Sequence, residues 1–86
     1  MEFYGIWSTG KGKWERIGQD AVCGLFSNYK EVVLGLFWCW MHDFQDRIDD
    51  ERKAGRYTYW QDTWQEAGYQ VRMLGDDGLP VGDPYN

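Results

Sequence analysis

The residues best suited to catalytic chemistry are a cysteine and a histidine three positions apart. Cys39 and the single histidine, His42, would share one side of a helix, where a thiolate beside an imidazole can act as a nucleophile. Together with Cys23 they could also be imagined as metal ligands. A structural zinc site commonly uses four ligands in paired short spacings, which this chain lacks. We therefore expect no metal and no cofactor, and interpret these residues more simply as packing residues.

A row of carboxylates follows directly after the histidine. Its members are Asp43, Asp46, Asp49, Asp50 and Glu51. Such a row could serve as a general acid–base set or bind a hard cation. It alternates with Arg47, Arg52 and Lys53, which is typical of a solvated helix end. The remaining interpretation is an electrostatic contact surface for a partner protein.

A long helix has to position these side chains. The stretch from Ser27 to Gly55 is apolar in its first half and charged in its second, and its ends suit an N-cap and a left-handed C-terminal residue. At about 100° per residue, seven apolar residues fall within roughly 140°, the width of a core-facing stripe. They are Val33, Leu36, Phe37, Trp40, Met41, Phe44 and Ile48. Because Glu51 falls in the same arc, we expect the helix to leave the core about one turn after Ile48.

Two alternatives stay open in this stretch. Residues 31–40 also suit a buried strand, because they are rich in β-branched and aromatic side chains, although the continuing periodicity favours a helix. Opposite the apolar stripe lie Trp38, His42 and Asp49. Either a second helix or a dimer partner covers Trp38, or this side chain is an exposed anchor beside the acidic row.

The remaining elements predict an α+β fold. Residues 2–8 and 13–18 alternate around a glycine-containing turn and predict a β-hairpin. A short helix, antiparallel to the long one, is expected between Thr58 as N-cap and Gly68 as C-cap, and residues 69–74 predict a third strand. We predict an antiparallel three-stranded sheet, made of the hairpin plus the C-terminal strand, with one long and one short helix packed on one face.

The length of 86 residues predicts a single domain. We expect residues 1–74 to form it and residues 75–86, rich in glycine, proline and aspartate, to form a flexible C-terminal tail. The connector 19–26 is undecided between strand and helical turn. The first residues lack the regions of a signal peptide, and the apolar run 32–41 is too short to span a bilayer. These features predict a cytoplasmic protein with reduced thiols.

Charge is distributed unevenly along the chain. Residues 1–42 carry four acidic and four basic side chains, whereas residues 43–86 carry ten acidic and five basic ones, so the second half holds the whole net charge of −5. This argues against direct nucleic-acid binding, which needs a basic footprint, and favours a partner with a basic surface. Aromatic residues make up 19% of the chain, enough to supply both core burial and interface anchors.

The segment Trp38–Glu51, WCWMHDFQDRIDDE, together with Asp76 and Asp77, resembles small phage-encoded inhibitors of the anti-CRISPR type. The resemblance is one of style, a compact acidic domain with aromatics and carboxylate rows. That group shares no motif, so no functional residue is carried over. The resemblance implies binding to a host CRISPR-Cas or other nucleic-acid-handling complex at a basic surface, which blocks its DNA contact.

We therefore predict a non-enzymatic binding protein whose partner is a host protein or ribonucleoprotein complex with a basic surface. The expected partner-binding residues are Trp38, His42, Asp43, Asp46, Asp49 and Asp50. Trp38 would anchor the complex and the carboxylates would steer association. We expect no membrane association. The second hypothesis is a structural or assembly protein forming a homodimer sealed by aromatics, and the third is a small enzyme that uses Cys39 and His42.

Overall fold

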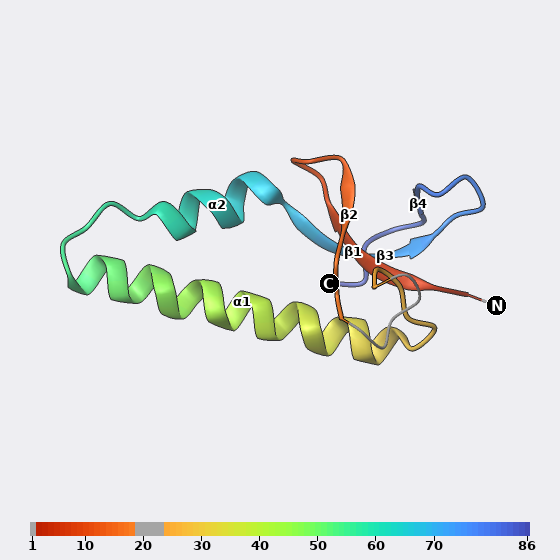
Figure 1. The fold of residues 1–86 in the computed structure, drawn as a ribbon, viewed down its shortest axis with the longest axis horizontal. Coiled ribbons are helices and arrows are strands. Elements are labelled where there is room, and N and C mark those ends of the chain that lie inside the picture. The colour runs from red at the N-terminus through yellow and green to blue at the C-terminus, as the bar shows by residue number, and fades with distance from the viewer. Residues whose placement is uncertain (1, 19–23) are drawn as a thin grey trace.

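In the computed structural model, residues 2–18 and 24–86 are described, and they form an α+β fold of two helices and one four-stranded antiparallel sheet. The elements are β1 (Tyr4–Ser8), β2 (Lys13–Glu15), α1 (Lys30–Lys53), α2 (Tyr59–Ala67), β3 (Tyr69–Leu74) and β4 (Pro80–Val81). The strand order in the sheet is β2-β1-β3-β4. The molecule measures 47 × 22 × 20 Å, because α1 and α2 extend beyond the sheet as an αα-hairpin (Figure 1).

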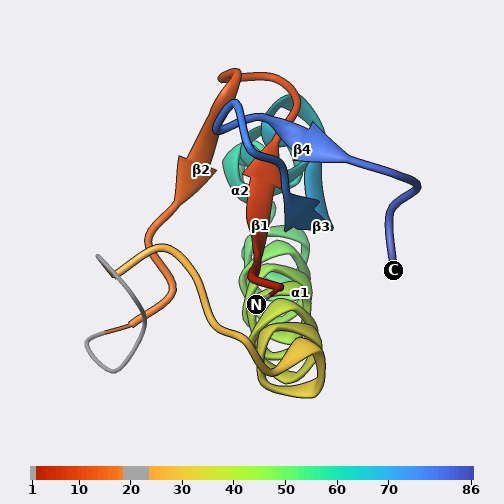
Figure 2. The same ribbon diagram turned by 90° about the vertical axis from the view of Figure 1, so that its right-hand side faces the viewer.

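The predicted hairpin and C-terminal strand are confirmed, and they meet at the centre of the sheet. Trp7 of β1 lies opposite Trp14 of β2, and Ile6 of β1 lies opposite Val71 of β3. Ile6 and Val71 are fully buried in the cluster that includes the apolar side chains of α1. Side chains alternate between the two faces of a strand, so Trp7 points away from α1. Figure 2, a view nearly along α1, shows the sheet on one side of this helix.

Aromatic rings cover the face of the sheet that points away from α1. Trp14 lies with its ring centroid 5.0 Å from that of Trp7 and 5.1 Å from that of Phe26. Gly5 lies beneath these rings, where a Cβ atom would come within 3.0 Å of both Trp14 and Phe26. Glycine is therefore needed here for close approach. Of the undecided connector, residues 19–23 lie outside the described part of the chain.

The predicted number of strands is wrong, because β4 adds a fourth. Met73 of β3 pairs with Val81 of β4. After β4 the chain returns to β3, where the Tyr85 N–H donates to the Val71 carbonyl at 3.0 Å and the Val71 N–H donates to Asn86 Oδ1 at 2.8 Å. These bonds satisfy backbone groups that an edge strand would otherwise expose. Residues 75–86 thus include a strand of the sheet, whereas the domain boundary and the flexibility of this segment stay predictions.

The helix predicted over residues 31–40 is confirmed, but its predicted N-cap is wrong. Ser27 exchanges two backbone hydrogen bonds with Tyr4, of 2.7 and 2.9 Å, so it belongs to an isolated β-bridge. The helix begins after Tyr29, whose N–H donates to the Ser27 hydroxyl at 3.1 Å. At the other end Gly55 has a φ of +67°, the left-handed conformation that the sequence predicts.

The apolar stripe of α1 faces the core as predicted, and a buried carboxylate follows it one turn beyond Ile48. Its buried or half-buried members are Val33, Leu36, Phe37, Trp40, Met41, Phe44 and Ile48. Glu51, one turn beyond Ile48, is only 7% exposed, and its Oε2 accepts a hydrogen bond from the Trp60 N–H at 3.3 Å. Thr58, the N-cap of α2, makes no side-chain cap hydrogen bond. A carboxylate on α1 therefore caps the N-terminus of α2, where the helix dipole favours negative charge.

The second helix packs chiefly on α1. It ends at Gly68, which has a φ of +56° as expected for a C-cap. Phe44 of α1 stacks on Trp64 of α2 with ring centroids 6.3 Å apart. The turn of the β-hairpin binds the C-terminal end of α2, since the Gly10 N–H donates to the Ala67 carbonyl at 3.1 Å. The expected packing of both helices on one sheet face therefore holds for the first half of α1, whereas α2 lies along its second half (Figure 1).

Candidate functional site

An exposed tryptophan lies on the outer face of α1. Trp38 is 59% exposed, and its ring contacts its neighbour Phe37 with a centroid distance of 5.2 Å. The two tryptophans of α2 do not cover it, because Trp60 and Trp64 pack against Phe44. The interpretation in which the second helix covers Trp38 is therefore wrong.

The surface next to Trp38 carries an apolar side chain, Val32, and a glycine, Gly35, beside which there is open space. Val32 is 51% exposed and Cys39 is a free, exposed thiol. Both are neighbours of Gly35 at helical spacing. A Cβ atom at Gly35 would meet nothing within 4 Å among the described residues, so no packing there requires glycine. Glycine in a helix interior costs about 1 kcal/mol relative to alanine. We call Val32, Gly35, Trp38 and Cys39 the outer strip.

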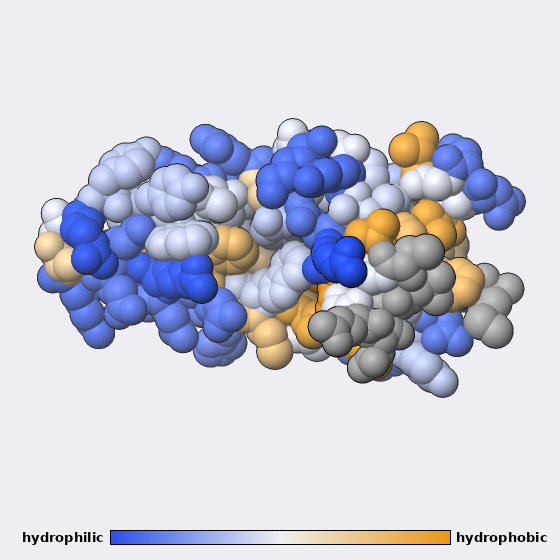
Figure 3. Space-filling view, in the orientation of Figure 1, coloured by the Kyte–Doolittle hydropathy of each residue, from blue (hydrophilic) through white to orange (hydrophobic). Residues whose placement is uncertain are grey.

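The predicted carboxylates Asp43, Asp46, Asp49 and Asp50 are all exposed on the second half of α1. Within the described ranges the ion pair is between Lys11 and Glu15, at 3.3 Å, so none of these four carboxylates forms one. Asp49 instead accepts a hydrogen bond from the Gln45 side-chain amide at 3.0 Å. Hydrophilic side chains cover most of the end of the αα-hairpin in Figure 3. This end of the molecule therefore presents exposed carboxylates without contact ion pairs, interspersed with Arg47, Arg52 and Lys53.

The cysteine and the histidine are both on the surface of α1. Cys39 and His42 are exposed, and Cys23 lies outside the described residues. Among residues 2–18 and 24–86, no group of three or more histidine, cysteine, aspartate or glutamate side chains could hold a metal ion. The enzyme hypothesis stays a prediction.

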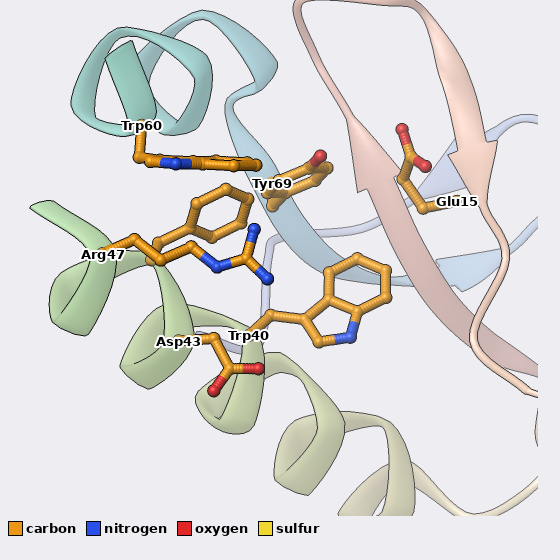
Figure 4. A pocket seen from close by; sticks show the side chains of 7 residues that line it. Glu15, Trp40, Asp43, Arg47, Trp60 and Tyr69 are labelled. Carbon is orange, nitrogen blue, oxygen red and sulfur yellow. The ribbon is translucent and has the colours of Figure 1, made fainter. Parts of the chain in front are cut away.

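A pocket that the sequence did not predict opens between the two helices and the sheet (Figure 4). Its volume is about 250 Å³. It is lined by Glu15, Trp40, Asp43, Phe44, Arg47, Trp60 and Tyr69. These residues come from β2, α1, α2 and β3, so only the folded chain brings them together. We call this the aromatic pocket.

The walls of the aromatic pocket are rings that hold one another in place. Tyr69 contacts Trp40 edge-on with a centroid distance of 5.5 Å and lies 6.0 Å from Phe44. Phe44 is also 6.0 Å from Trp60. The guanidinium carbon of Arg47 lies 4.3 Å from the Trp60 ring centroid, a cation–π distance. In Figure 4 this guanidinium extends from α1 into the space between Trp60, Tyr69 and Trp40.

Burial and two nearby charges act on the pKa of the phenol in the aromatic pocket. Burial raises the pKa of Tyr69, the nearby Glu15 carboxylate raises it further, and the Lys11 ammonium opposes both. The hydrogen bond to Glu15 raises the pKa of Lys11. At neutral pH the Tyr69 phenol is therefore neutral and Lys11 is charged.

Comparison of the chain with protein-family models, with curated proteins and with solved structures finds no match. The function therefore has to be argued from the sites themselves. Neither helix in the described part of the chain combines the length and the apolar character that crossing a bilayer requires.

Part of the aromatic pocket has a signal in the sequence. Trp40, Phe44 and Arg47 follow one another at helical spacing along one edge of the apolar stripe. Two aromatic residues followed by an arginine at this spacing indicate the place where the helix surface changes from buried to solvent-exposed. Glu15 and Tyr69 carry no such signal, because their place depends on the pairing of β1 with β2 and β3.

Proposed function

We propose that this chain is a non-enzymatic binding protein that occludes a basic surface of a nucleic-acid-handling host complex, as its resemblance to anti-CRISPR inhibitors implies, and that it acts in the host cytoplasm. One observation carries the proposal. The exposed Trp38 lies on the same helix as four exposed carboxylates that form no ion pair among the described residues. An exposed tryptophan supplies an interface anchor, and uncompensated carboxylates attract and orient a basic partner.

The shape of α1 supports separate roles for Trp38 as the anchor and for the carboxylates as steering groups. The second half of α1 extends beyond the sheet together with α2 in a molecule 47 Å long, so the αα-hairpin presents a protruding surface to a partner (Figure 1). The outer strip offers an apolar contact with a close-approach point at Gly35. Asp46, Asp49 and Asp50 lie further toward the end of the αα-hairpin. Contact with a basic groove would bury Trp38 while the carboxylates face its lysine and arginine side chains.

The first experiment identifies the partner. Tagged protein is incubated with host lysate and washed at low or at high salt, and captured proteins are identified by mass spectrometry. We expect a nucleic-acid-processing complex that is lost at high salt, because long-range charge attraction is screened. Capture of no protein other than this chain would contradict the proposal.

Matched variants then test the site. Asp46→Lys with Asp50→Lys should weaken capture and flatten its salt dependence. Asp76→Lys with Asp83→Lys changes the net charge equally, at exposed positions outside α1, and should have a smaller effect. Trp38→Ala should weaken capture at both salt concentrations. Unchanged affinity in the α1 double variant would refute the electrostatic part of the proposal.

The outer strip also supports a second function, a homodimer. A second copy could pack its Trp38 and Val32 against the same residues, since both are exposed in one chain. A parallel pairing of the two helices would bring two acidic rows together and cost repulsion, whereas an antiparallel pairing would keep them apart. Sedimentation analysis decides: a dimer that dissociates on Trp38→Ala would favour this alternative, and a monomer at all concentrations would reject it.

A further inference from the structure

We infer that the aromatic pocket is a receptor for an arginine side chain of the basic partner, and that Arg47 occupies this receptor in the free protein. The source of the incoming arginine rests on the proposed function. The chemistry of the pocket rests on its own geometry.

The first argument is that the pocket already holds a guanidinium. The Arg47 group lies 4.3 Å from the centre of Trp60 and extends between three labelled rings in Figure 4. Aromatic faces carry partial negative charge and attract a cation placed over them. Arg47 is one of the lining residues, so about 250 Å³ is the space left beside its side chain, just below the roughly 300–1,000 Å³ usual for drug-sized ligands.

The second argument is that Arg47 can be displaced at low cost. It is an exposed residue, and within the described ranges no hydrogen bond or ion pair holds its guanidinium. Moving it outward therefore breaks only the ring contact. The incoming guanidinium would make the same ring contact, so replacing one guanidinium by the other changes the cation–π free energy little. The carboxylates on the pocket lining then decide the binding free energy.

The third argument is the charge of the rim. Asp43 and Glu15 place two carboxylates on the lining, and Asp43 forms no ion pair among the described residues. Glu15 is partly compensated by Lys11, 3.3 Å away. Once Arg47 has moved outward, Asp43 remains to pair with the incoming cation, and a guanidinium is suited to bidentate pairing with a carboxylate. An anionic guest would meet both carboxylates and is disfavoured.

The test uses the full chain and isotope-labelled tryptophan. N-acetyl-arginine amide is added while the indole N–H signals of Trp40, Trp60 and Trp38 are followed by NMR. The neutral isostere N-acetyl-citrulline amide is the matched control. We expect Trp40 and Trp60 to shift with the arginine compound and not with the citrulline compound, while Trp38, on the outer face of α1 and outside the pocket lining, stays unchanged. Equal shifts with both compounds would overturn the inference.

Variants test the role assigned to Arg47. Arg47→Gln removes the internal competitor and should tighten arginine binding about 3- to 10-fold, as expected from loss of one cation–π contact. Asp43→Asn should weaken binding about 2- to 5-fold, in the range of one partly exposed charge pair. If Arg47→Gln instead weakens binding, Arg47 is part of the receptor and not its occupant. Because both residues are exposed, we expect both variants to fold, which the Trp38 signal reports.

The outcome for the pocket is separable from that for the proposed function. If arginine does not bind while Trp38→Ala still weakens capture of the host complex, the inference fails and the proposed function stands. If arginine binds but Asp43→Asn leaves capture of the complex unchanged, the partner does not supply the arginine and that part of the inference is overturned. Weakened arginine binding in Asp43→Asn, together with a loss of capture larger than that in Asp46→Asn, which lies outside the pocket lining, supports both.

Discussion

The two halves of α1 bury different kinds of surface. The first half packs on the sheet, where Val33, Ile6 and Val71 are fully buried and form a continuous apolar cluster. The second half packs on α2 through half-buried rings, the buried side chain of Ile48 and the buried carboxylate of Glu51. An apolar core is insensitive to salt and partners, whereas rings, rims and carboxylates can exchange their contacts for those of another molecule. The continuous apolar cluster therefore lies at the sheet end, whereas the aromatic pocket and the exposed aspartates lie toward the helical end.

The largest expected effect separates the two halves by stability. Phe37→Ala, in the sheet half, should lower the free energy of unfolding by about 3–4 kcal/mol, because it empties a buried site. Phe44→Ala, in the helical half, should cost less, because Phe44 is only half-buried. Urea denaturation followed by circular dichroism measures both. Equal losses would mean that the two halves form one core.

The cap supplied by Glu51 predicts a smaller and local effect. Glu51→Ala should cost about 1 kcal/mol, because the N-terminus of α2 loses its acceptor. Glu51→Gln keeps an acceptor oxygen and should cost less. Hydrogen exchange should accelerate in α2 and stay unchanged in β1 and β3. Faster exchange throughout the sheet would show that Glu51 supports the whole fold rather than the αα-hairpin.

The outer strip predicts opposite effects on stability and binding. Gly35→Ala should raise the free energy of unfolding by up to about 1 kcal/mol, because alanine favours the helix and its methyl group meets open space. The same variant should weaken capture of a partner that packs closely at Gly35. Thermal unfolding and the capture assay are compared in one preparation. Unchanged capture would remove Gly35 from the interface while leaving Trp38 as the anchor.

The pKa values of two tyrosines, one at the sheet end and one at the aromatic pocket, are raised by different main causes. The hydrogen bond to Glu2 raises the pKa of Tyr4, at the sheet end, to about 12, whereas burial is the main cause that raises the pKa of Tyr69, at the aromatic pocket. A raised tyrosine pKa means that the contribution to stability is present below the unfolded pKa of about 10 and is lost as pH rises through the folded value. For Tyr4 this loss falls between about pH 10 and pH 12.

Phenolate absorbance during an alkaline titration measures these values. Glu2→Gln should lower the pKa of Tyr4 and leave Tyr69 unchanged, because Glu2 acts on Tyr4. Glu15→Gln should lower the pKa of Tyr69, to which that carboxylate contributes after burial. A Tyr4 step that does not move in Glu2→Gln would remove the hydrogen bond as the cause.

Local patterns in the sequence determined most of the helices and the central strands. The stripe of α1, the left-handed ends at Gly55 and Gly68 and the alternation in β1 and β3 all depend on neighbours a few residues apart, so they can be read without the fold. The exposure of Trp38 was an open alternative, because it depends on where α2 packs. Asp43, Asp46, Asp49 and Asp50 are exposed in the structure, as their positions outside the apolar stripe predict.

Tertiary contacts decided the features that the sequence misplaced. Ser27 suits an N-cap, but the bridge to Tyr4 satisfies two backbone groups and delays the helix. The two residues of β4 include a proline and follow a glycine-containing turn, so their local pattern does not predict a strand. They form one because they pair with the backbone groups at the edge of β3. The charge of Glu51 predicts that α1 leaves the core there, but α2 packs against it and the Trp60 N–H donates a hydrogen bond to its carboxylate. The aromatic pocket combines four separate elements, so no local pattern could predict it, since only folding brings distant residues within contact distance.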